Sequence, residues 1–593
     1  MFGYLEGAET HQGDSSNDVR REGVKSSMSA SFKTSSLFLL VLALLCAPAG
    51  TSWGATIDAA SCSYEDVSAA VQAATWGDTV RVPAGEADWG ESSLVVTKGI
   101  ELLGAGSSQT IISSTLLEPE TYAYLISFEA DETTAANDQA FKLDGFTLKA
   151  NGSYPPYGLL RLSNPNYPTH LSKVVVSNNV FQQLVDSGYT SFAIGLYPGV
   201  FGVTFHNEIV DGDHAWRFLG SLESGKTVEH WEPGSPYAMY FEDNYIHLSE
   251  PWGSTLIISG GGGNRYVSRY NTFDASVNGP DEYTQAHDIH GNQPNNPGAG
   301  IGFEAYGELR LGGVGRWFDE RGGQVYFFMN QWTESGGSGS YYVWEEYDDD
   351  TFTPSSCEGL NYPTTAGGTN CLQRARDSYF WRNFGGESGT TLSTSLVVQF
   401  DYFDRSIEPP TVNEPLTLFE NQSWWRDTAE PFTGAVEPVG SCGYYEGPSC
   451  QSSGIGCGTL ADMQAIETCT EGVGFWVTSQ GTCDDLSGYV GHDHTQTIEG
   501  TLYRCNAANG WEPVYVPYTY PHPLRAGEGG AGGAGGSGAS GGAGGSAGDA
   551  AASGDEEGCS CGLPGTSQRS RPWPLALGLA FSAAAAVRRR RRS

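Results

Sequence analysis

The chain is constrained most by a short motif that recurs along its middle part. In this motif a strand-like apolar run leads into an asparagine and then a bulky residue. The copies read VVVSNNVF, VTFHNEI, MYFEDNYI, VSRYNTF, YFFMNQW and TLFENQS. Their asparagines lie 28, 37, 27, 59 and 91 residues apart. The gap of 59 residues could hold two coils, and the gap of 91 residues could hold three or more. The asparagines are Asn179, Asn207, Asn244, Asn271, Asn330 and Asn421.

Repeat periods of roughly 20–50 residues are typical of a solenoid, in which each coil lays its strand over the previous one. Asparagines at one fixed turn can then hydrogen-bond to their own copies along the axis of the stack. A β-sandwich with unrelated Asn-containing turns is the alternative. The solenoid is preferred because the beginning of the chain agrees with it.

In SCSYEDVSAAVQAATWGDTVRVPAGEADWG, Val67, Ala70, Val71 and Ala74 have helical spacing. A short amphipathic helix is therefore expected, followed by β-rich runs that Gly and Pro separate. This passage closely resembles the N-terminal cap and first coils of right-handed parallel β-helix proteins of the pectate-lyase-like class. The resemblance implies an all-β fold, a right-handed parallel β-helix over residues 55–428, with the short helix capping its N-terminal end.

The repeat signature stops near residue 429, and residues 429–526 are rich in cysteine and turn residues. The stretch LYRCNAANGW…PYTYPHPL resembles the ending of many bacterial secreted β-helix proteins, so this region is predicted to be a disulfide-stapled C-terminal cap. Cys62 is expected to be a buried free thiol. Disulfides of unassigned connectivity are expected among eight cysteines, which suits an oxidising compartment. They are Cys357, Cys371, Cys442, Cys450, Cys457, Cys469, Cys483 and Cys505.

Both ends of the chain indicate export. Residues 1–54 contain Lys33, an apolar run from Leu37 to Cys46 and a small-residue cleavage site, the pattern of a signal peptide. Residues 527–558 form a Gly/Ala/Ser-rich linker. Residues 572–587 are apolar and precede five arginines. As a helix this run spans about 24 Å, slightly short of a bilayer core, and arginine stems can bridge the difference.

This order of features in residues 559–593, with Cys559 and Cys561 before the apolar segment, resembles the MYXO-CTERM sorting signal. It implies processing near the cysteines and display at the cell surface, with the membrane contacted through residues 572–587. A plain one-pass anchor gives the same outside location. The chain has a formal net charge of −38, so nucleic acid is excluded as a partner. A monomer is expected.

The densest group of polar residues lies between residues 287 and 321. Residues one coil apart stack laterally in a β-helix, so His287–His290, Glu304–Tyr306 and Arg316–Arg321 are expected to line one face. The catalytic candidates are His287, His290, Glu304, Arg316 and Arg321, and the candidate metal ligands are Asp288 and Asp319.

Three functions fit this group. A polysaccharide lyase would use a histidine or an arginine as base, with Ca²⁺ or arginine neutralising a uronate. Calcium is the one cofactor that this chemistry would call for. A glycoside hydrolase would pair Glu304 with Asp288 or Asp319. A non-catalytic adhesin or structural protein would bind glycans through aromatic side chains such as Tyr306, Trp317, Tyr341 and Trp344.

The motifs WiDH and RxPxxR of pectate lyases and the polygalacturonase set are missing from the chain, and the acidic body disfavours a polyanionic substrate. The sequence therefore predicts a cell-surface-anchored β-helix protein that binds or degrades extracellular polysaccharide. It leaves open whether the protein is an enzyme. Trp424 and Trp425 are expected to plug the end of the coil, with a sugar platform as the alternative.

Overall fold

The computed structural model describes most of residues 54–526, all of which belong to one compact unit. The described ranges are 54–115, 124–151, 158–166, 169–182, 192–197, 199–211, 214–218, 232–248, 257–260, 265–277, 286–289, 300, 302–312, 316–333, 340–346, 375, 377–385, 391–392, 397–403, 420–422, 424–427, 431–436 and 453–526. The predicted signal peptide, the linker and the sorting signal with Cys559, Cys561 and residues 572–587 lie outside them. No helix in the described ranges is long and apolar enough to span a membrane.

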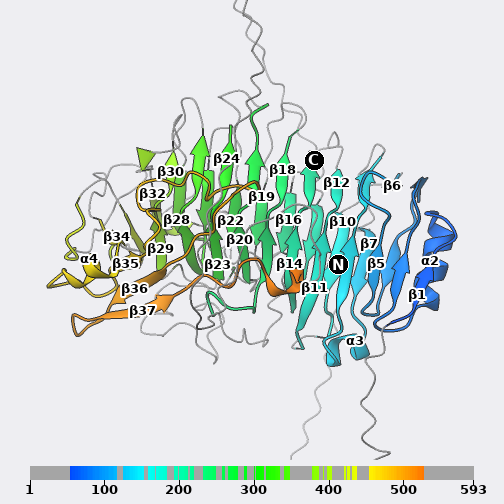
Figure 1. Ribbon diagram of the computed structural model, residues 1–593, viewed down its shortest axis with the longest axis horizontal. Coiled ribbons are helices and arrows are strands. Elements are labelled where there is room, and N and C mark those ends of the chain that lie inside the picture. The colour runs from blue at the N-terminus through cyan, green and yellow to red at the C-terminus, as the bar shows by residue number, and fades with distance from the viewer. Residues whose placement is uncertain are drawn as a thin grey trace, which may run out of the picture. The chain divides into compact units, whose positions relative to one another are not determined.

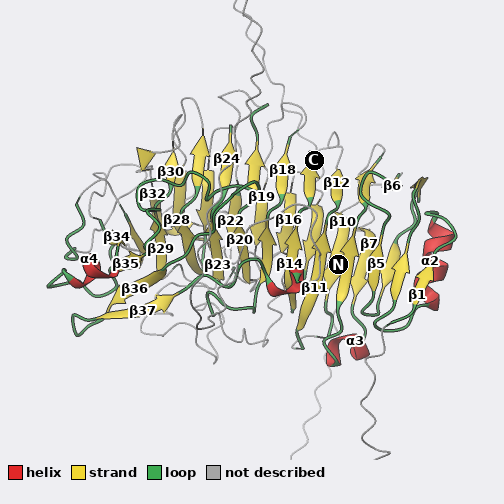
Figure 2. Ribbon diagram, in the orientation of Figure 1, coloured by secondary structure: helices red, strands yellow, loops and turns green. Residues whose placement is uncertain are grey.

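The chain is a right-handed parallel β-helix, as predicted, and each full coil visits three long sheets in turn (Figures 1 and 2). Among the described residues, sheet A has twelve parallel strands. They are β1 (Thr56–Asp58), β2 (Thr79–Arg81), β5 (Glu101–Leu103), β8 (Phe141–Asp144), β11 (Leu171–Ser177), β14 (Val200–Phe205), β17 (Met239–Glu242), β20 (Arg265–Arg269), β23 (Gly302–Tyr306), β26 (Gln324–Phe328), β29 (Ser378–Trp381) and β33 (Trp424–Arg426).

Sheet B follows sheet A in each coil and is parallel except where its last two strands pair. Its strands are β3 (Gly85–Asp88), β6 (Thr110–Ser114), β9 (Thr147–Ala150), β12 (Val180–Gln182), β15 (Glu208–Val210), β18 (Tyr245–His247), β21 (Thr272–Asp274), β24 (Leu309–Leu311), β27 (Gln331–Thr333), β30 (Phe384–Gly385) and β31 (Thr391–Leu392).

Sheet C completes the coil. Its strands are β4 (Leu94–Val96), β7 (Tyr124–Glu129), β10 (Gly158–Ser163), β13 (Phe192–Leu196), β16 (His214–Phe218), β19 (Ile257–Gly260), β22 (His287–Ile289), β25 (Arg316–Glu320), β28 (Ser340–Glu346) and β32 (Val397–Phe403). The side chains that the three sheets turn inward form one continuous core, made mainly of Val, Leu, Ile, Phe and Ala. Burial of this core is the main force that stacks the coils.

The turn between sheets A and B carries the predicted asparagine ladder. Asn179, Asn207 and Asn244 each donate from the backbone N–H and from Nδ2 to the Oδ1 of the ladder asparagine one coil further on, at 2.9–3.1 Å. Asn330 does the same to Asn383. These bonds satisfy buried amides that water cannot reach.

The residue before each ladder position adopts a left-handed backbone conformation, with φ between 51° and 66°. These residues are Asn178, His206, Asp243, Tyr270, Gly307, Met329 and Arg382. At the ladder position after Gly307 stands Glu308 in place of asparagine. Asn421 is not a ladder residue, because it precedes β33 of sheet A rather than following a strand of that sheet.

The helix expected at the start of the β-helix is α2 (Tyr64–Ala73). The Ser63 side chain caps it by accepting from the Asp66 N–H, and Val67, Ala70 and Val71 bury its apolar face. A second short helix, α3 (Glu132–Ala136), lies between β7 and β8. Cys62 is a buried free thiol, as expected.

The C-terminal region forms a small mixed sheet of β34 (Ile455–Gly458), β35 (Gly474–Val477), β36 (Thr501–Cys505) and β37 (Trp511–Tyr515), with α4 (Leu460–Gln464) beside it. Disulfides join Cys457 to Cys483 and Cys469 to Cys505, which confirms the prediction for these four cysteines. Cys357, Cys371, Cys442 and Cys450 lie outside the described residues.

This region does more than close the end of the β-helix. Residues 515–526, here called the strap, run back along the outer face of sheet A and end in the 3₁₀ turn η3 (Pro523–Arg525) beside β14 (Figure 1). A second apolar core, which includes Tyr240, Phe328 and Trp381, fills the space between this face and the C-terminal region. Sheet A is therefore buried on both faces from β14 onward. In the first coils Arg81 and Glu101 are exposed on its outer face.

Candidate functional site

The candidate site on sheet C contains Asp288, Asp319 and Arg321. Asp288 on β22 lies in register with Asp319 on the neighbouring parallel strand β25. Adjacent strands are about 4.8 Å apart, so the two carboxylates project side by side from the sheet. Arg321, just after β25, donates from Nε to Asp288 Oδ1 at 2.9 Å and grips the same carboxylate through Nη2. The sequence-predicted Asp288, Asp319 and Arg321 thus come together.

All three side chains are little exposed: Asp288 is 7 % exposed, Asp319 2 % and Arg321 5 %. Two like charges at this separation repel each other, and the Arg321 guanidinium bound to Asp288 offsets part of this repulsion. Removing an unpaired charge from water costs on the order of several kcal/mol. Chemically, this arrangement can accept hydrogen bonds from sugar hydroxyls or contribute oxygen ligands to a cation.

Calcium is bound by about six to eight oxygen ligands, so Asp288 and Asp319 alone would not complete its coordination. Within the described ranges, no group of three or more His, Cys, Asp or Glu side chains is placed to hold a metal ion.

His287 lies on the same strand but faces the interior of the β-helix. Its Nε2 is 2.7 Å from Oε2 of Glu308, the residue that occupies the asparagine position of the ladder. Ser268 donates to the other oxygen of Glu308, and the imidazole packs against Phe303. His287, Glu308 and Ser268 are all completely buried. This polar group is enclosed by the coil, so a polysaccharide outside the coil cannot touch it.

Glu304 lies elsewhere, on β23 of sheet A beneath the strap. Its Oε2 accepts from the Tyr515 hydroxyl at 2.6 Å, and its Oε1 accepts from the Gly234 N–H at 2.8 Å. Burial raises the pKa of Glu304 to about 7, although these two hydrogen bonds and the charge of Arg269 act to lower it. Glu304 is 1 % exposed, so a substrate could reach it only if the strap moved away.

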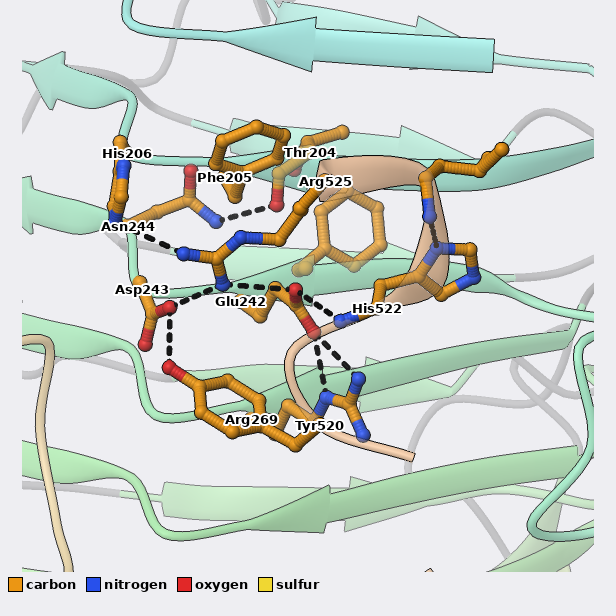
Figure 3. A network of polar contacts seen from close by, with 12 residues as sticks. Thr204, Phe205, His206, Glu242, Asp243, Asn244, Arg269, Tyr520, His522 and Arg525 are labelled. Carbon is orange, nitrogen blue, oxygen red and sulfur yellow. Dashed lines mark hydrogen bonds and ion pairs between the residues drawn. The ribbon is translucent and has the colours of Figure 1, made fainter. Parts of the chain in front are cut away.

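The strap is held by a network of charges drawn in Figure 3. Arg269 on β20 binds Glu242 on β17 with Nε–Oε2 2.7 Å, and it also donates to the carbonyl oxygens of Tyr518 and Thr519. Arg525 donates to Oε1 of Glu242 at 2.9 Å. Burial opposes the charged form of Glu242, but the two arginines offset it, so its pKa lies below the usual value.

The strap also bonds to the turn beside sheet A. Tyr520 donates to Asp243 at 2.6 Å, and Arg525 reaches the same carboxylate. His522 donates its backbone N–H to Glu242 at 3.0 Å. Burial lowers the pKa of the His522 imidazole to about 4, so this ring is neutral at ordinary pH.

The expectation of one shared face is therefore met only in part. A coil contributes one strand to each sheet, so residues 302–306 fall on sheet A, while residues 287–289 and 316–320 fall on sheet C. His290 and the side chains of Arg316, Tyr341 and Trp344 lie outside what the structure describes. Trp317 and Tyr306 are 0 % and 1 % exposed, so neither offers a ring for a sugar to stack on.

Glu242 and Arg269 were not singled out in the sequence, although a signal for them is present. Each lies two residues before a ladder asparagine, and the strands pair Phe205, Glu242, Arg269 and Tyr306 in one column. Opposite charges in consecutive copies of a stacked repeat predict an ion pair between coils.

No protein-family model matches the chain, and no curated protein matches it. Among solved structures, the chain is similar to a PL6 family polysaccharide lyase, Pedsa3628 from Pseudopedobacter saltans, at 13 % identity and a TM-score of 0.24. The match covers 61 % of this chain and 97 % of the lyase. A likeness this low has no bearing on what the chain binds or whether it is an enzyme.

Proposed function

We propose that this chain is an exported protein, anchored at the cell surface, that binds extracellular polysaccharide along the outer face of sheet C. Asp288 and Arg321, which are 7 % and 5 % exposed, would contact the glycan, and Asp319, which is 2 % exposed, would lie beneath the contact and support them. The disulfides Cys457–Cys483 and Cys469–Cys505 support an oxidising location. The long sheet supports an extended ligand, because its strands repeat at a fixed spacing along the axis as sugar units do along a polymer.

The observation that carries the proposal is the register of Asp288 and Asp319 on adjacent strands, with Arg321 beside them. Ionisable side chains gathered in one place and largely removed from water are candidates for a functional site. Carboxylates and a guanidinium on a rigid sheet are well suited to hold sugar hydroxyls in fixed directions.

Binding is preferred over cleavage because two of the acid–base candidates are out of reach. His287 is enclosed in the coil, and Glu304 is covered by the strap. Cleavage is the second candidate, since Asp288 and Asp319 together can contribute to a cation site that would neutralise a uronate. In that case His290 or Arg316 would supply the base, and the reaction would be an elimination.

The test uses the purified protein on a panel of neutral and uronate polysaccharides, with calcium and with a chelator. Retention of the protein on one glycan would be measured together with reducing ends and the ultraviolet absorbance of unsaturated uronides. Retention that Asp319→Asn abolishes, without new ends or absorbance, supports binding. Calcium-dependent absorbance identifies a lyase, and reducing ends alone identify a hydrolase.

The matched control is Glu129→Gln, an acid on β7 of the same sheet that pairs with Arg161 far from the candidate site. It should leave retention unchanged. Equal loss in both variants would indicate general electrostatics rather than a site, and absence of retention and of products on every polysaccharide would overturn the proposal.

A further inference from the structure

A cavity of about 380 Å³ lies where the last coil meets the C-terminal sheet. Its walls come from residues just before β29 and β33, from the turn that leads into β35, and from β36 and β37. Most of the lining residues are polar, and they include Asp377, Gln422, Glu471, Arg504 and Glu512, with Trp425 beside them. This volume is within the range of sites for small ligands.

The walls of the cavity are held rigidly. Trp425 stacks on Tyr379 with ring centroids 4.9 Å apart and an interplanar angle of 13°. Tyr379 donates its hydroxyl to the carbonyl oxygen of Gly472 at 2.8 Å. The disulfide between Cys469 and Cys505 ties the turn to β36. A site fixed in this way needs little rearrangement to receive a ligand.

Gly472 is required at this wall. Its φ is +90°, and a Cβ atom there would lie 2.2 Å from Cζ2 of Trp425. Glycine has no Cβ and tolerates a positive φ, so it lets the backbone lie directly against the indole at the edge of the cavity.

The chemistry of the lining selects among ligands. Asp377, Glu471 and Glu512 bring three carboxylates against one guanidinium, Arg504, which already pairs with Glu512 at 3.1 Å. An anion would meet net negative charge and is disfavoured. A carboxylate accepts hydrogen bonds from hydroxyl groups, and an amide such as that of Gln422 both accepts and donates. This lining suits a neutral ligand that carries several hydroxyl groups.

Trp425 forms part of the cavity wall. It is 3 % exposed and lines the cavity. Its Nε1–H is buried inside the wall and is not accessible from the cavity.

We infer that this cavity is a second saccharide site, which takes a neutral sugar unit at the C-terminal end of the β-helix. The inference rests on the proposed function only in expecting the ligand among extracellular glycans. The site differs from the sheet C surface, because none of its lining residues comes from β22 or β25. It would hold the end or a branch of a glycan rather than the length of a polymer.

The test is calorimetric titration of the intact protein with neutral mono- and disaccharides: glucose, galactose, mannose, N-acetylglucosamine, cellobiose and maltose. One of them should bind, and Glu471→Gln combined with Gln422→Ala should weaken it at least about tenfold, as expected for loss of hydrogen bonds to a charged and a polar group. Both residues are exposed at the rim, so the variant should fold.

The matched control is Glu467→Gln, the same exchange four residues earlier at an exposed position outside the lining. It should bind as the unaltered protein does.

The outcomes separate the two proposals. Sugar binding that survives Glu471→Gln with Gln422→Ala but disappears in Asp319→Asn overturns the cavity site and leaves the sheet C proposal intact. Binding of polysaccharide without binding of any small sugar does the same. Small-sugar binding that requires the cavity residues, without any binding of polysaccharide, supports the cavity and overturns the sheet C proposal. Binding of a small amine such as putrescine in place of sugars identifies a cation pocket and overturns the inference.

Discussion

Glu304 is a carboxyl group enclosed between sheet A and the strap, and its ionisation is linked to folding. Because burial raises its pKa from 4.5 to about 7, the folded protein keeps this proton at pH values where the unfolded chain has lost it. The stability that follows is fully present below about pH 4.5 and is lost as the pH rises through about 7. The loss is roughly 3 kcal/mol.

We therefore expect Glu304→Gln, which keeps the shape and cannot ionise, to gain stability relative to the unaltered protein between pH 5 and pH 8. Urea unfolding at both pH values measures the difference. His522 acts in the opposite direction, because its lowered pKa costs stability as the pH falls, but it is common to both proteins and cancels. A difference that does not change with pH would show that Glu304 stays charged in the folded state.

Glu308 shows how one residue changes a repeating structure. The ladder bonds run from Asn179 to Asn271 and resume when Glu308 donates its backbone N–H to Asn330. Glu308 itself turns its carboxylate to His287 and Ser268 inside the coil. A carboxylate has no N–H with which to continue the ladder, so the coil satisfies it with an imidazole from sheet C.

At the scale of elements, the strap depends on charges that sheet A presents to it. Arg269 is completely buried and bonds to Glu242 and to two strap carbonyl groups. We expect Arg269→Met to destabilise the protein by about 3–5 kcal/mol, the usual cost of leaving one partner of a buried pair alone. Arg525→Met should cost about 1–3 kcal/mol, because Arg269 still neutralises Glu242.

Amide hydrogen exchange of residues 516–526 measures this effect directly, since a loosened strap exchanges faster. Lys173→Met is the matched control, because Lys173 on β11 forms an exposed ion pair with Asp138 in which no strap residue takes part. It should leave exchange in the strap as it was. Unchanged exchange in Arg269→Met would mean that apolar packing alone holds the strap.

The coils were predictable from the sequence because their cause is local. The spacing of Asn179, Asn207, Asn244 and Asn271 reports a turn that each coil repeats, and the structure contains that ladder. Asn383 was missed although its local sequence, FWRNFG, also leads from apolar residues into an asparagine and a bulky residue. Asn421 was included because its local sequence matches, although the turn it occupies is a different one.

The site was less predictable, because the side of the β-helix on which a residue lies depends on the sheet that its strand joins. The polar group at residues 287–321 is continuous in sequence, yet Asp288 and Arg321 project from sheet C while Glu304 lies on sheet A. The strap adds a second reason. Its contacts join residues more than two hundred positions apart, such as Glu304 with Tyr515, and no periodic signal reports such a pairing.

At the scale of the whole molecule, the C-terminal region forms a second core together with the outer face of sheet A and does more than cover one end of the β-helix. Between sheet A and this region lie Tyr240, Tyr306, Phe328 and Trp381, which are 0–1 % exposed. The outward side chains of a β-helix ordinarily face water, and here they are aromatic over several coils. The β-helix therefore depends on the C-terminal region to cover this face.

We expect truncation after Asp427 to expose this aromatic column and to yield a protein that binds a hydrophobic dye, associates or fails to stay soluble. Truncation after Ala526 keeps the C-terminal sheet, both disulfides and the strap, and should unfold at the temperature of the whole chain. Thermal unfolding, light scattering and dye fluorescence of the two shortened proteins provide the comparison. A monomeric product of the first truncation with an unchanged unfolding temperature would show that the β-helix is stable by its inner core alone. In that case the strap would be a removable cover over sheet A, and Glu304 would return as a residue that a substrate can reach.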